Sequence, residues 1–216
     1  MLKREKDKFS IICNIENELK KPLPGIDFQL KMAPESRLRN LITVSENSKE
    51  SGVLLLLYFK NELLTIVLIQ RAINNGVHSG QISLPGGRFD ENDIDLMYTS
   101  LRETYEEIGI HPSDVKILGK LTSLFIPVSN YVVYPFVGFC HKVPGFRLNV
   151  SEVSAVIEIP MMDFLKKNNQ VTGYVEVRGN KYLVPFYKIG ENQIWGATAM
   201  ILSEFVQIIN NIGIYD

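Results

Sequence analysis

The sequence predicts an α/β (α+β) fold in which helices cover a central mixed β-sheet. Segments with the length and composition of strands occur at residues 53–59, 63–69, 115–121, 131–140 and 153–159. Helical patterns interrupt them at irregular intervals, without the strict alternation of strand and helix that is typical of a doubly wound parallel sheet. With 216 residues, of which 45% are hydrophobic and 22% charged, the chain is long and apolar enough for one core. We therefore expect one domain over residues 1–216.

The first part of the chain predicts a helix and a β-hairpin. Residues 5–20 place apolar side chains at approximate helical spacing, and two prolines shortly afterwards end the pattern. The first two apolar runs flank the polar triplet 60–62, which is the pattern of a hairpin inside a buried sheet. We treat residues 1–45 as an N-terminal helical extension of the domain.

The rest of the chain predicts helices between further strands. A loop rich in Asn, Gly and His follows the hairpin, and residues 94–108 have helical spacing. Three later elements complete the prediction. They are a short helix after Pro160, a hairpin of residues 171–177 and 181–187 around Arg178-Gly179-Asn180, and an amphipathic helix over 197–209.

Composition and charge exclude several classes of protein. Lys and Arg number 23 and Asp and Glu 24, so the net charge of -1 lacks the basic excess of a protein that binds nucleic acid. The longest apolar run, 53–59, is far shorter than the roughly 18 residues of a membrane-spanning helix. No export signal is recognisable in the first 30 residues, and two cysteines are too few for a disulfide framework. We expect a cytoplasmic protein that binds neither nucleic acid nor membrane.

The most informative segment is an acidic helix that ends near Gly109. Glu103, Glu106 and Glu107 fall on one stripe of this helix, at spacing i, i+3 and i+4. Such carboxylates repel one another by roughly a few tenths of a kcal/mol per pair, so a cation is expected between them. Arg102 supplies one charge, and clustered carboxylate oxygens are also the ligands of Mg²⁺ or Mn²⁺. For the isolated motif, a solvated acidic face is the alternative.

The surroundings of this helix favour a binding site. Pro85-Gly86-Gly87 predicts a tight turn in which glycine lets the backbone approach a ligand closely. Gly109 stands where the end of a helix favours a positive φ. A stripe with helical spacing is expected to face the core. Its members are Leu101, Thr104, Tyr105 and Ile108.

These residues resemble the signature of the Nudix hydrolases, G-x5-E-x7-R-E-U-x-E-E-x-G-U, in which U is a bulky aliphatic residue. The matching residues are Gly87 for the first glycine and Arg102, Glu103, Glu106, Glu107, Gly109 and Ile110 for the second half. Three departures occur: Asp93 replaces the first glutamate, the gap from Asp93 to Arg102 is one residue longer, and Thr104 replaces the bulky U. The first two departures are expected of one branch of the family, the coenzyme A pyrophosphatases.

The box covers residues 86–110. The segment that precedes it resembles the same branch. The branch signature is approximately L-x-T-x-R-(S/A)-x3-(R/M/F)-x3-G-Q-x-x-(F/L)-P-G-G. This chain carries Arg71, Ala72 and then a match over residues 80–87. Gln70 replaces the usual Thr, and Gly76 replaces a large residue. One side-chain contact to the substrate is therefore expected to be missing or supplied elsewhere.

The resemblance implies a Nudix α/β/α sandwich that holds Mg²⁺ or Mn²⁺. The implied metal ligands are Glu103, Glu106, Glu107 and a backbone carbonyl near Gly86. Arg102 is implied to orient the first glutamate of the box, and the base that deprotonates water is implied to be a box glutamate, such as Glu103 or Glu106, or a loop glutamate, for which Glu152 is the candidate. The residues implied to contact the substrate are Arg71, Gly80, Gln81 and Gly87.

The branch implies that the small-molecule substrate is coenzyme A or one of its acyl or oxidised forms, cut into 3',5'-ADP and 4'-phosphopantetheine derivatives. A pyrophosphatase for ADP-ribose, NADH or another nucleoside diphosphate derivative is an alternative, because the box recognises the diphosphate and not its substituents. A Nudix-fold regulator that binds a nucleotide without cleaving it is a second alternative, although the complete set of box carboxylates favours catalysis. The oligomeric state is open, with a homodimer as one candidate.

Several of these residues also have a structural interpretation. Arg71 fits a surface ion pair at the end of a strand equally well, and Glu152 is suggested by its position alone. Trp195 with Tyr187 offers a surface on which adenine could stack, but a single Trp before a closing helix more often lies in the core. His111 follows a helix end, where capping explains it better than catalysis.

Overall fold

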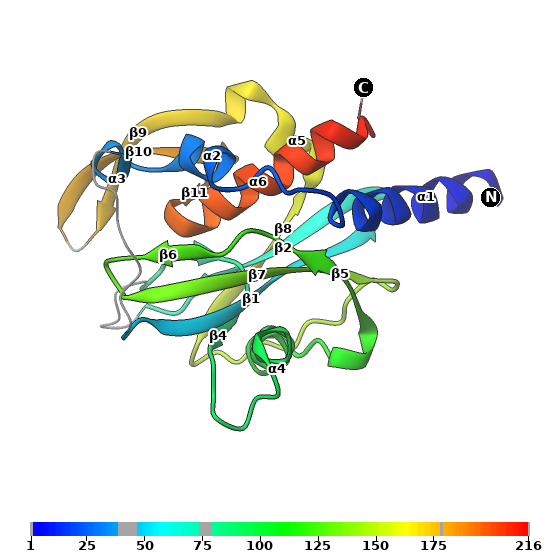
Figure 1. Cartoon of the computed structure of the whole chain (residues 1–216), viewed down its shortest axis with the longest axis horizontal. Coiled ribbons are helices and arrows are strands. Elements are labelled where there is room, and N and C mark those ends of the chain that lie inside the picture. Colours follow the sequence, from blue (N-terminus) through cyan, green and yellow to red (C-terminus); the bar gives the residue numbers. More distant parts are fainter. Residues whose placement is uncertain (1, 39–46, 74–78, 178, 216) are drawn as a thin grey trace.

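The computed structural model describes residues 2–38, 47–73, 79–177 and 179–215, which form two β-sheets covered by helices (Figure 1). Within these ranges the larger sheet has eight strands, in the order β3-β2-β1-β7-β5, with β4 paired to β1, β6 to β7 and β8 to β2. The strands are β1 (Lys49–Lys60), β2 (Leu63–Arg71), β3 (Ile82–Ser83), β4 (Gly86–Arg88), β5 (Val115–Lys120), β6 (Leu124–Ile126), β7 (Tyr131–Cys140) and β8 (Val153–Pro160). Because β1 is parallel to β7 and antiparallel to β2, the sheet is mixed, as predicted.

Alternate residues of β1 face two different cores. Leu55 and Leu57 pack in the core that contains residues of α1 (Leu2–Glu18) and α6 (Gly196–Ile212). Leu54 and Leu56 pack on the other face with Ile108 of α4 (Leu96–Ile108). Figure 1 shows α4 on one side of the sheet and α1 and α6 on the other. The sheet is therefore the middle layer of an α/β/α sandwich, and its central strands are apolar on both faces.

Helix α4 lies directly on β1 because Gly52 has no side chain. A Cβ at Gly52 would stand 2.2 Å from the carbonyl oxygen of Leu96 and 3.0 Å from the amide nitrogen of Ser100. The start of the helix therefore rests on the backbone of the strand. This contact sets the position of the acidic residues one and two turns later in α4.

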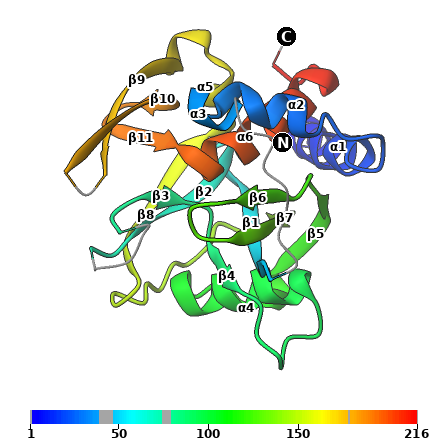
Figure 2. The same cartoon turned by 60° about the vertical axis from the view of Figure 1, so that its left-hand side comes forward.

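The smaller sheet is antiparallel and stands beside the end of the sandwich (Figure 2). Its strands are β9 (Gln170–Val177), β10 (Asn180–Ile189) and β11 (Asn192–Trp195). Val175, Val184 and Phe186 form a separate small core, against which Trp195 packs. The predicted hairpin is thus confirmed, although Arg178 of its turn lies outside the described residues.

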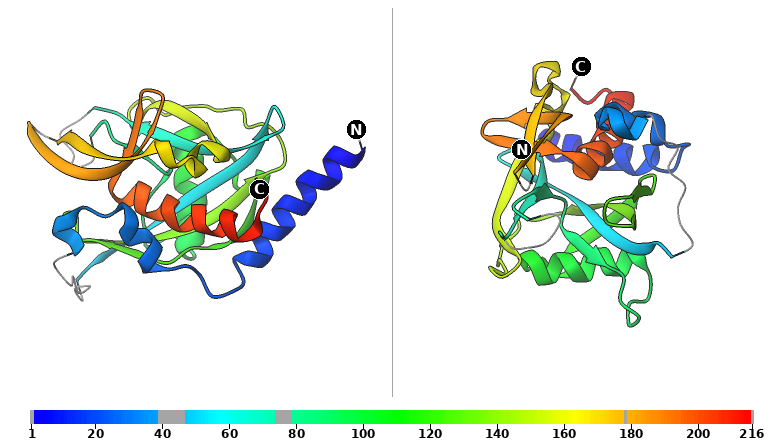
Figure 3. Two further views of the ribbon diagram at one scale, coloured as in Figure 1. Left: turned by 90° about the horizontal axis from the view of Figure 1, so that it is seen from above. Right: turned by 90° about the vertical axis from the view of Figure 1, so that its left-hand side faces the viewer.

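The closing helix is longer and more deeply buried than the sequence predicts. Every residue of α6 from Thr198 to Val206 is buried. The helix contacts α1 and α2 (Ile26–Gln29) from the N-terminal segment, β6 of the larger sheet, and β10 and β11 of the smaller sheet (Figure 3). An amphipathic pattern predicts one buried face, so this part of the prediction is wrong. No helix within the described residues, α6 included, is long and apolar enough to span a membrane.

The other predicted elements are confirmed with small shifts at their ends, and β7 has the predicted bounds of 131–140. The sequence does not predict the short strands β3, β4, β6 and β11, because two to four residues carry too little periodicity to be recognised. The remaining short elements are α3 (Glu35–Leu38), α5 (Met161–Leu165) and the 3-10 helices η1 (Leu30–Met32), η2 (Pro112–Asp114) and η3 (Lys167–Asn169).

A buried carboxylate joins the N-terminal segment to α6. Glu204 has no exposed surface, and one of its oxygens accepts a hydrogen bond from the Gly25 amide at 3.1 Å. The Gln29 side-chain amide donates to the other oxygen at 2.9 Å. The Thr122 hydroxyl and amide also donate, at 2.6 and 3.2 Å. Because these donors come from two separate parts of the chain, Glu204 holds the segment from Gly25 to Gln29 against the sandwich.

Candidate active site

Helix α4 carries the acidic residues of the box, and both of its ends are fixed. The Asp95 carboxylate caps the first turn by accepting a hydrogen bond from the amide of Tyr98 at 2.7 Å. Gly109 ends the helix in the left-handed conformation, with φ of 77°, and its amide donates to the carbonyl of Tyr105. The predicted helix end is confirmed. The helix begins at Leu96 rather than at residue 94 because Asp95 is its cap.

The buried face of α4 differs from the predicted one. Thr104 and Ile108 are fully buried, as expected, and Leu101 packs against the core. Tyr105, however, is 49% exposed and lies edge-on to the ring of His111, whereas Glu107 is only 1% exposed. The prediction that Tyr105 faces the core is therefore wrong. The first turns of the helix rest on Gly52, and this contact rotates the helix so that Glu107 faces the sheet.

The two glycines of the box place bare backbone against two carboxylates. The Gly86 amide donates to Oε2 of Glu107 at 2.9 Å. Gly86 has φ of 142°, and a Cβ there would stand 2.4 Å from the carbonyl oxygen of Gly52. A Cβ at Gly87 would stand 2.3 Å from the carboxyl carbon of Glu103. A side chain at Gly87 would displace the Glu103 carboxylate, and a side chain at Gly86 would collide with the backbone of β1, which is the physical reason for glycine at both positions.

Arg102 lies among three acidic side chains. Its Nε and Nη2 donate to the two carboxylate oxygens of Asp93 at 2.7 and 2.9 Å, which is a bidentate pair. Its Nη1 lies 2.9 Å from Oε1 of Glu103 and 3.1 Å from Oε2 of Glu106. Hydrogen bonding to Arg102 lowers the pKa of Asp93 to about 2, and the pKa of Arg102 is raised in turn. Arg102 is therefore held in one orientation beside Glu103.

The sequence alone does not reveal what Asp93 does. The carboxylate is buried and also accepts hydrogen bonds from the Thr99 hydroxyl at 2.8 Å and the Asp90 amide at 3.0 Å. Asp93 thus joins the loop before α4 to the helix while it holds Arg102. The available signal was its place in the box, where the general signature has a glutamate.

Glu107 is a carboxylate buried without a full counter-charge. Burial raises its pKa to about 7, against the Gly86 N–H and Arg71, which lower it. The charges of Glu103 and Glu152 raise it further. Burial also raises the pKa of Glu103, opposed by Arg102 and reinforced by Glu106 and Glu152. Glu103, Glu107 and Glu152 are therefore close enough to act on one another electrostatically, and water is partly excluded from Glu103 and Glu107.

Glu152 joins this group from a different part of the chain. It lies just before β8, where its backbone carbonyl accepts a hydrogen bond from the amide of Ala72 at 2.7 Å. Its exposed carboxylate accepts a hydrogen bond from the side-chain amide of Asn149 at 3.3 Å. The end of β2 and the start of β8 thereby bring Glu152 to the same side as the box glutamates.

Arg71 ends β2 and faces the same carboxylates. Its Nη1 lies 3.6 Å from Oε1 of Glu107, so it forms an ion pair with a residue of the box. Its backbone amide donates to the carbonyl of Gln81 at 3.0 Å. The carbonyl of Gly80 accepts a long hydrogen bond, of 3.5 Å, from the Gln70 side chain. Arg71, Gly80 and Gln81 therefore lie together, whereas Gly76 of the same loop is outside the described residues.

The residues fit a divalent metal ion by their chemistry. Within the described ranges, no three acidic, histidine or cysteine side chains already converge as a metal cluster. Even so, Glu103, Glu107 and Glu152 supply hard oxygen donors, and Glu107 is buried with too little positive charge around it. Divalent cations such as Mg²⁺ prefer such oxygens. The absence of a side chain at Gly87 also lets the Glu103 carboxylate lie directly against the backbone of the turn.

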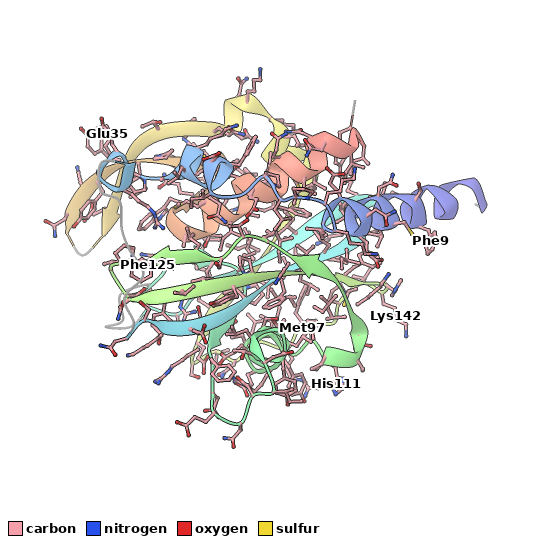
Figure 4. All side chains as sticks on the ribbon, viewed as in Figure 1. Phe9, Glu35, Met97, His111, Phe125 and Lys142 are labelled. Carbon is pink, nitrogen blue, oxygen red and sulfur yellow. The ribbon has the colours of Figure 1, made fainter. Side chains whose placement is uncertain are left out.

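Other candidate residues have structural surroundings. Tyr187 is almost completely buried, with its ring 5.2 Å from that of Phe164, and Trp195 packs on the small core. The two do not form an exposed stacking surface. His111 caps η2, not α4, by accepting a hydrogen bond from the Ser113 amide, and it lies beside the end of α4 (Figure 4).

Comparison with known proteins identifies the family. The NUDIX domain family matches residues 49–175, which is more than half of the chain. The chain therefore belongs to the Nudix family, and it is a Nudix hydrolase that acts on nucleoside diphosphate derivatives. The hydrolases of this family generally use divalent metal ions, in agreement with the donor set described above.

Similar proteins occur in bacteria and plants. An uncharacterized Nudix hydrolase NudL of Photorhabdus laumondii is 32% identical over 180 residues, which cover 83% of this chain and 92% of the relative. Nudix hydrolase 22 of Arabidopsis thaliana, a chloroplastic protein, is 34% identical over 88% of this chain. The alignment spans only 62% of that plant protein, which is longer.

Solved structures support the fold. A MutT/nudix family protein from Enterococcus faecalis matches with a TM-score of 0.53 and 16% identity, over 85% of this chain and 72% of that one. The Nudix hydrolase RenU from M. Smegmatis matches with a TM-score of 0.52 and 12% identity, over 76% of this chain and 88% of that one. At this level of identity the likeness concerns the fold alone.

Proposed function

We propose that this enzyme hydrolyses the pyrophosphate bond of coenzyme A or its derivatives with Mg²⁺ or Mn²⁺. One water molecule is added across the diphosphate. The products are 3',5'-ADP and 4'-phosphopantetheine or its acylated or oxidised counterpart. The family sets the class of reaction, and the choice of coenzyme A rests on the residues at positions 71–72 and 80–87.

The observation that carries the proposal is the environment of Glu107. A carboxylate that is 1% exposed needs full hydrogen bonding or a cation to remain charged. Glu107 has the Gly86 amide at 2.9 Å and Arg71 at 3.6 Å, and it also feels the charges of Glu103 and Glu152. A divalent ion would supply the missing positive charge at this place.

We assign the metal to Glu103, Glu106 and Glu107 and to the backbone carbonyl of Gly86. When bound, the ion supplies positive charge to a diphosphate whose oxygens become more negative as the bond breaks. Glu106 is the most exposed of the three glutamates and is linked to Glu103 through Arg102. Their different burial lets the same set contact both the ion and a solvent-facing substrate.

The proton of the attacking water needs an acceptor. The candidates are Glu152 and the box glutamates Glu103 and Glu106, and the electrostatic contact of Glu152 with Glu103 and Glu107 favours its inclusion. Arg102, fixed by Asp93, holds Glu103 in one orientation and so supports either choice. A pH profile of kcat/KM for Glu152→Gln separates these roles, because loss of the base removes the acidic limb.

We assign substrate contacts to Arg71, Gly80, Gln81 and Gly87. Arg71 offers a guanidinium to phosphate oxygens, and it is 34% exposed. Gly80 and Gln81 lie beside it through backbone hydrogen bonds. Gly87 lies against Glu103. A diphosphate bound over Gly87 would therefore lie near Glu103 as well as near Arg71.

The test is a panel of diphosphates with Mg²⁺ and with Mn²⁺, with products identified by mass. The panel contains coenzyme A, its 3'-dephospho form, acetyl-coenzyme A, ADP-ribose and NADH. We expect the highest kcat/KM on coenzyme A or its acyl form, with 3',5'-ADP released. Preference for ADP-ribose or NADH would overturn the choice of substrate and leave the diphosphate chemistry standing. Binding of these compounds without any cleavage would indicate a regulator and overturn catalysis.

We propose that this reaction takes place in the cytoplasm, which suits the free thiols of Cys13 and Cys140. For the oligomeric state we propose a test of the homodimer by light scattering of the purified chain at several concentrations.

A further inference from the structure

We propose that Arg71 is an internal counter-ion of the metal site, which a divalent ion displaces from Glu107 and which then binds the substrate diphosphate. The inference rests on the proposed role of Glu107 as a metal ligand. We infer in addition that the Arg71 side chain weakens metal binding before the substrate arrives and strengthens it afterwards. Metal and substrate binding would therefore be coupled through Arg71.

The base of the Arg71 side chain is held firmly. The backbone amide donates to Gln81 at 3.0 Å, and Arg71 pairs with Val153 of β8 across a register shift that follows Gln70. The next amide, that of Ala72, donates to Glu152 at 2.7 Å. Movement of Arg71 is therefore confined to its long side chain, whose end can change partner without any change in the sheet.

The contact between Arg71 and Glu107 is weak compared with the pair that Arg102 makes. Arg102 forms two hydrogen bonds of 2.7 and 2.9 Å with Asp93. The Arg71 guanidinium lies 3.6 Å from Glu107, which is an ion pair too long for a hydrogen bond, and it is 34% exposed. Partly exposed pairs of this kind contribute little stability, so a stronger cation can replace Arg71.

A divalent ion and Arg71 cannot share Glu107 without cost. The oxygen Oε1 pairs with Arg71, while Oε2 already accepts the Gly86 amide. An ion bound at Oε1 would meet a positive guanidinium at short range, and like charges repel. The guanidinium can move outward to the side on which Gly80 and Gln81 lie. There its planar array of N–H donors suits two phosphate oxygens.

This arrangement gives Arg71 effects of opposite sign in two states. Without substrate, Arg71 weakens metal binding because it competes for Glu107. With a diphosphate bound, the guanidinium has an anionic partner, so the competition disappears and metal binding strengthens. A purely structural ion pair would affect folding and not metal affinity, and a residue that only binds substrate would leave metal affinity unchanged in its absence.

The experiment measures Mn²⁺ affinity by electron paramagnetic resonance, without substrate and with the non-hydrolysable adenosine 5'-(α,β-methylene)diphosphate. The variants are Arg71→Ala, Arg71→Lys and Glu107→Gln. The control is Lys142→Ala, which removes an exposed positive charge just beyond the end of β7 (Figure 4). This position is far from the site, because β7 is parallel to β1 and the glycines of β4 pair with the start of β1. Melting temperatures report whether each variant is folded.

We expect Arg71→Ala to bind Mn²⁺ roughly two- to tenfold more tightly than wild type without the diphosphate, as expected for the loss of a partly exposed competing charge. Arg71→Lys, which keeps the charge, and Lys142→Ala should resemble wild type. The diphosphate should tighten Mn²⁺ binding several-fold in wild type and much less in Arg71→Ala. The combination of these results supports the coupling.

Two results overturn the inference, and they are distinguishable. If Glu107→Gln loses Mn²⁺ binding while Arg71→Ala binds it no more tightly than wild type, the counter-ion role fails and the proposed metal site stands. If Glu107→Gln binds Mn²⁺ as tightly as wild type, the ligand assignment fails, and the role of Arg71 fails with it. If Arg71→Ala does not fold, the Mn²⁺ affinities of Arg71→Lys and Arg71→Gln are compared instead. Tighter binding by Arg71→Gln supports the counter-ion role, and equal binding overturns it.

Discussion

Two glutamates in this protein are equally buried and have opposite surroundings. Glu107 on α4 is 1% exposed, and Glu204 on α6 is 0% exposed, on opposite faces of the same sheet. Glu204 accepts hydrogen bonds at both oxygens from neutral donors of Gly25, Gln29 and Thr122. Among the described residues, Glu107 accepts one hydrogen bond, from the Gly86 amide, and has the more distant Arg71 as its ion-pair partner.

The difference separates a structural carboxylate from a binding one. Hydrogen bonds from several neutral donors satisfy a buried carboxylate, so Glu204 joins three segments and has no need of a ligand. A buried carboxylate with fewer donors and acidic neighbours is unfavourable in the free protein, and it gains when a cation arrives. Burial alone therefore does not identify a functional glutamate, whereas the partners of its two oxygens do.

The largest expected effect is on turnover. Glu107→Gln should lower kcat by about a thousandfold or more, because a lost metal ligand removes several kcal/mol of transition-state stabilisation. The fold should survive, since a neutral amide suits a buried site that lacks counter-charge. Steady-state kinetics on the best diphosphate, with saturating Mn²⁺, measure this. The control Glu204→Gln, where folded, should retain near wild-type kcat, and similar losses in both variants would contradict the distinction.

The second prediction concerns stability, for which we expect substitution of Glu204 to have a larger effect than substitution of Glu107. Glu204→Ala leaves the donors of Gly25, Gln29 and Thr122 without their acceptor. At about 1–3 kcal/mol for each unsatisfied buried group, partly relieved by water, the free energy of unfolding should fall by roughly 3–5 kcal/mol. Urea unfolding followed by circular dichroism measures the loss. Glu107→Ala should lose much less, and equal losses would show that the two carboxylates are alike.

The third prediction concerns pH in the metal-free protein. The folded pKa of Glu107 is raised from 4.5 to about 7, so its folded state prefers the protonated form. Its destabilising effect is absent below the unfolded pKa of 4.5, grows as pH rises from there to about 7, and levels off above that at roughly 3 kcal/mol. Urea unfolding in EDTA at pH 5.5 and 8 should show wild type losing stability relative to Glu107→Gln. A pH-independent difference between the two would contradict the burial argument.

The smallest expected effect is stabilisation by metal. An ion that binds only the folded state stabilises it by RT ln(1 + [L]/Kd), or about 2.7 kcal/mol at one hundred times Kd. Wild type should melt at a higher temperature in Mn²⁺ than in EDTA. The triple variant of Glu103, Glu106 and Glu107 to Gln should lose most of this shift, whereas Glu204→Gln should keep it. An undiminished shift in the triple variant would place the ion elsewhere.

The sequence by itself determined the elements with strong local signals. The helix of residues 5–20, the hairpin of β1 and β2 and the strand β7 were predictable because their apolar spacing extends over many residues. Gly109 was predictable as a helix end because its backbone conformation is a property of glycine itself. The box was recognisable because its residues lie on one turn and one helix, so that their spacing along the chain fixes their arrangement.

The tertiary structure decided which of these residues are buried and what they contact. Tyr105 is exposed and Glu107 is buried, the opposite of the prediction, because α4 rests on Gly52, a neighbour distant in sequence. Glu152 joins the box glutamates through the pairing of β2 with β8, and α6 is buried on several sides because separate segments cover it. Local periodicity reports which residues of an element share a face. The neighbours of that face are set by long-range packing, which no short stretch of sequence contains.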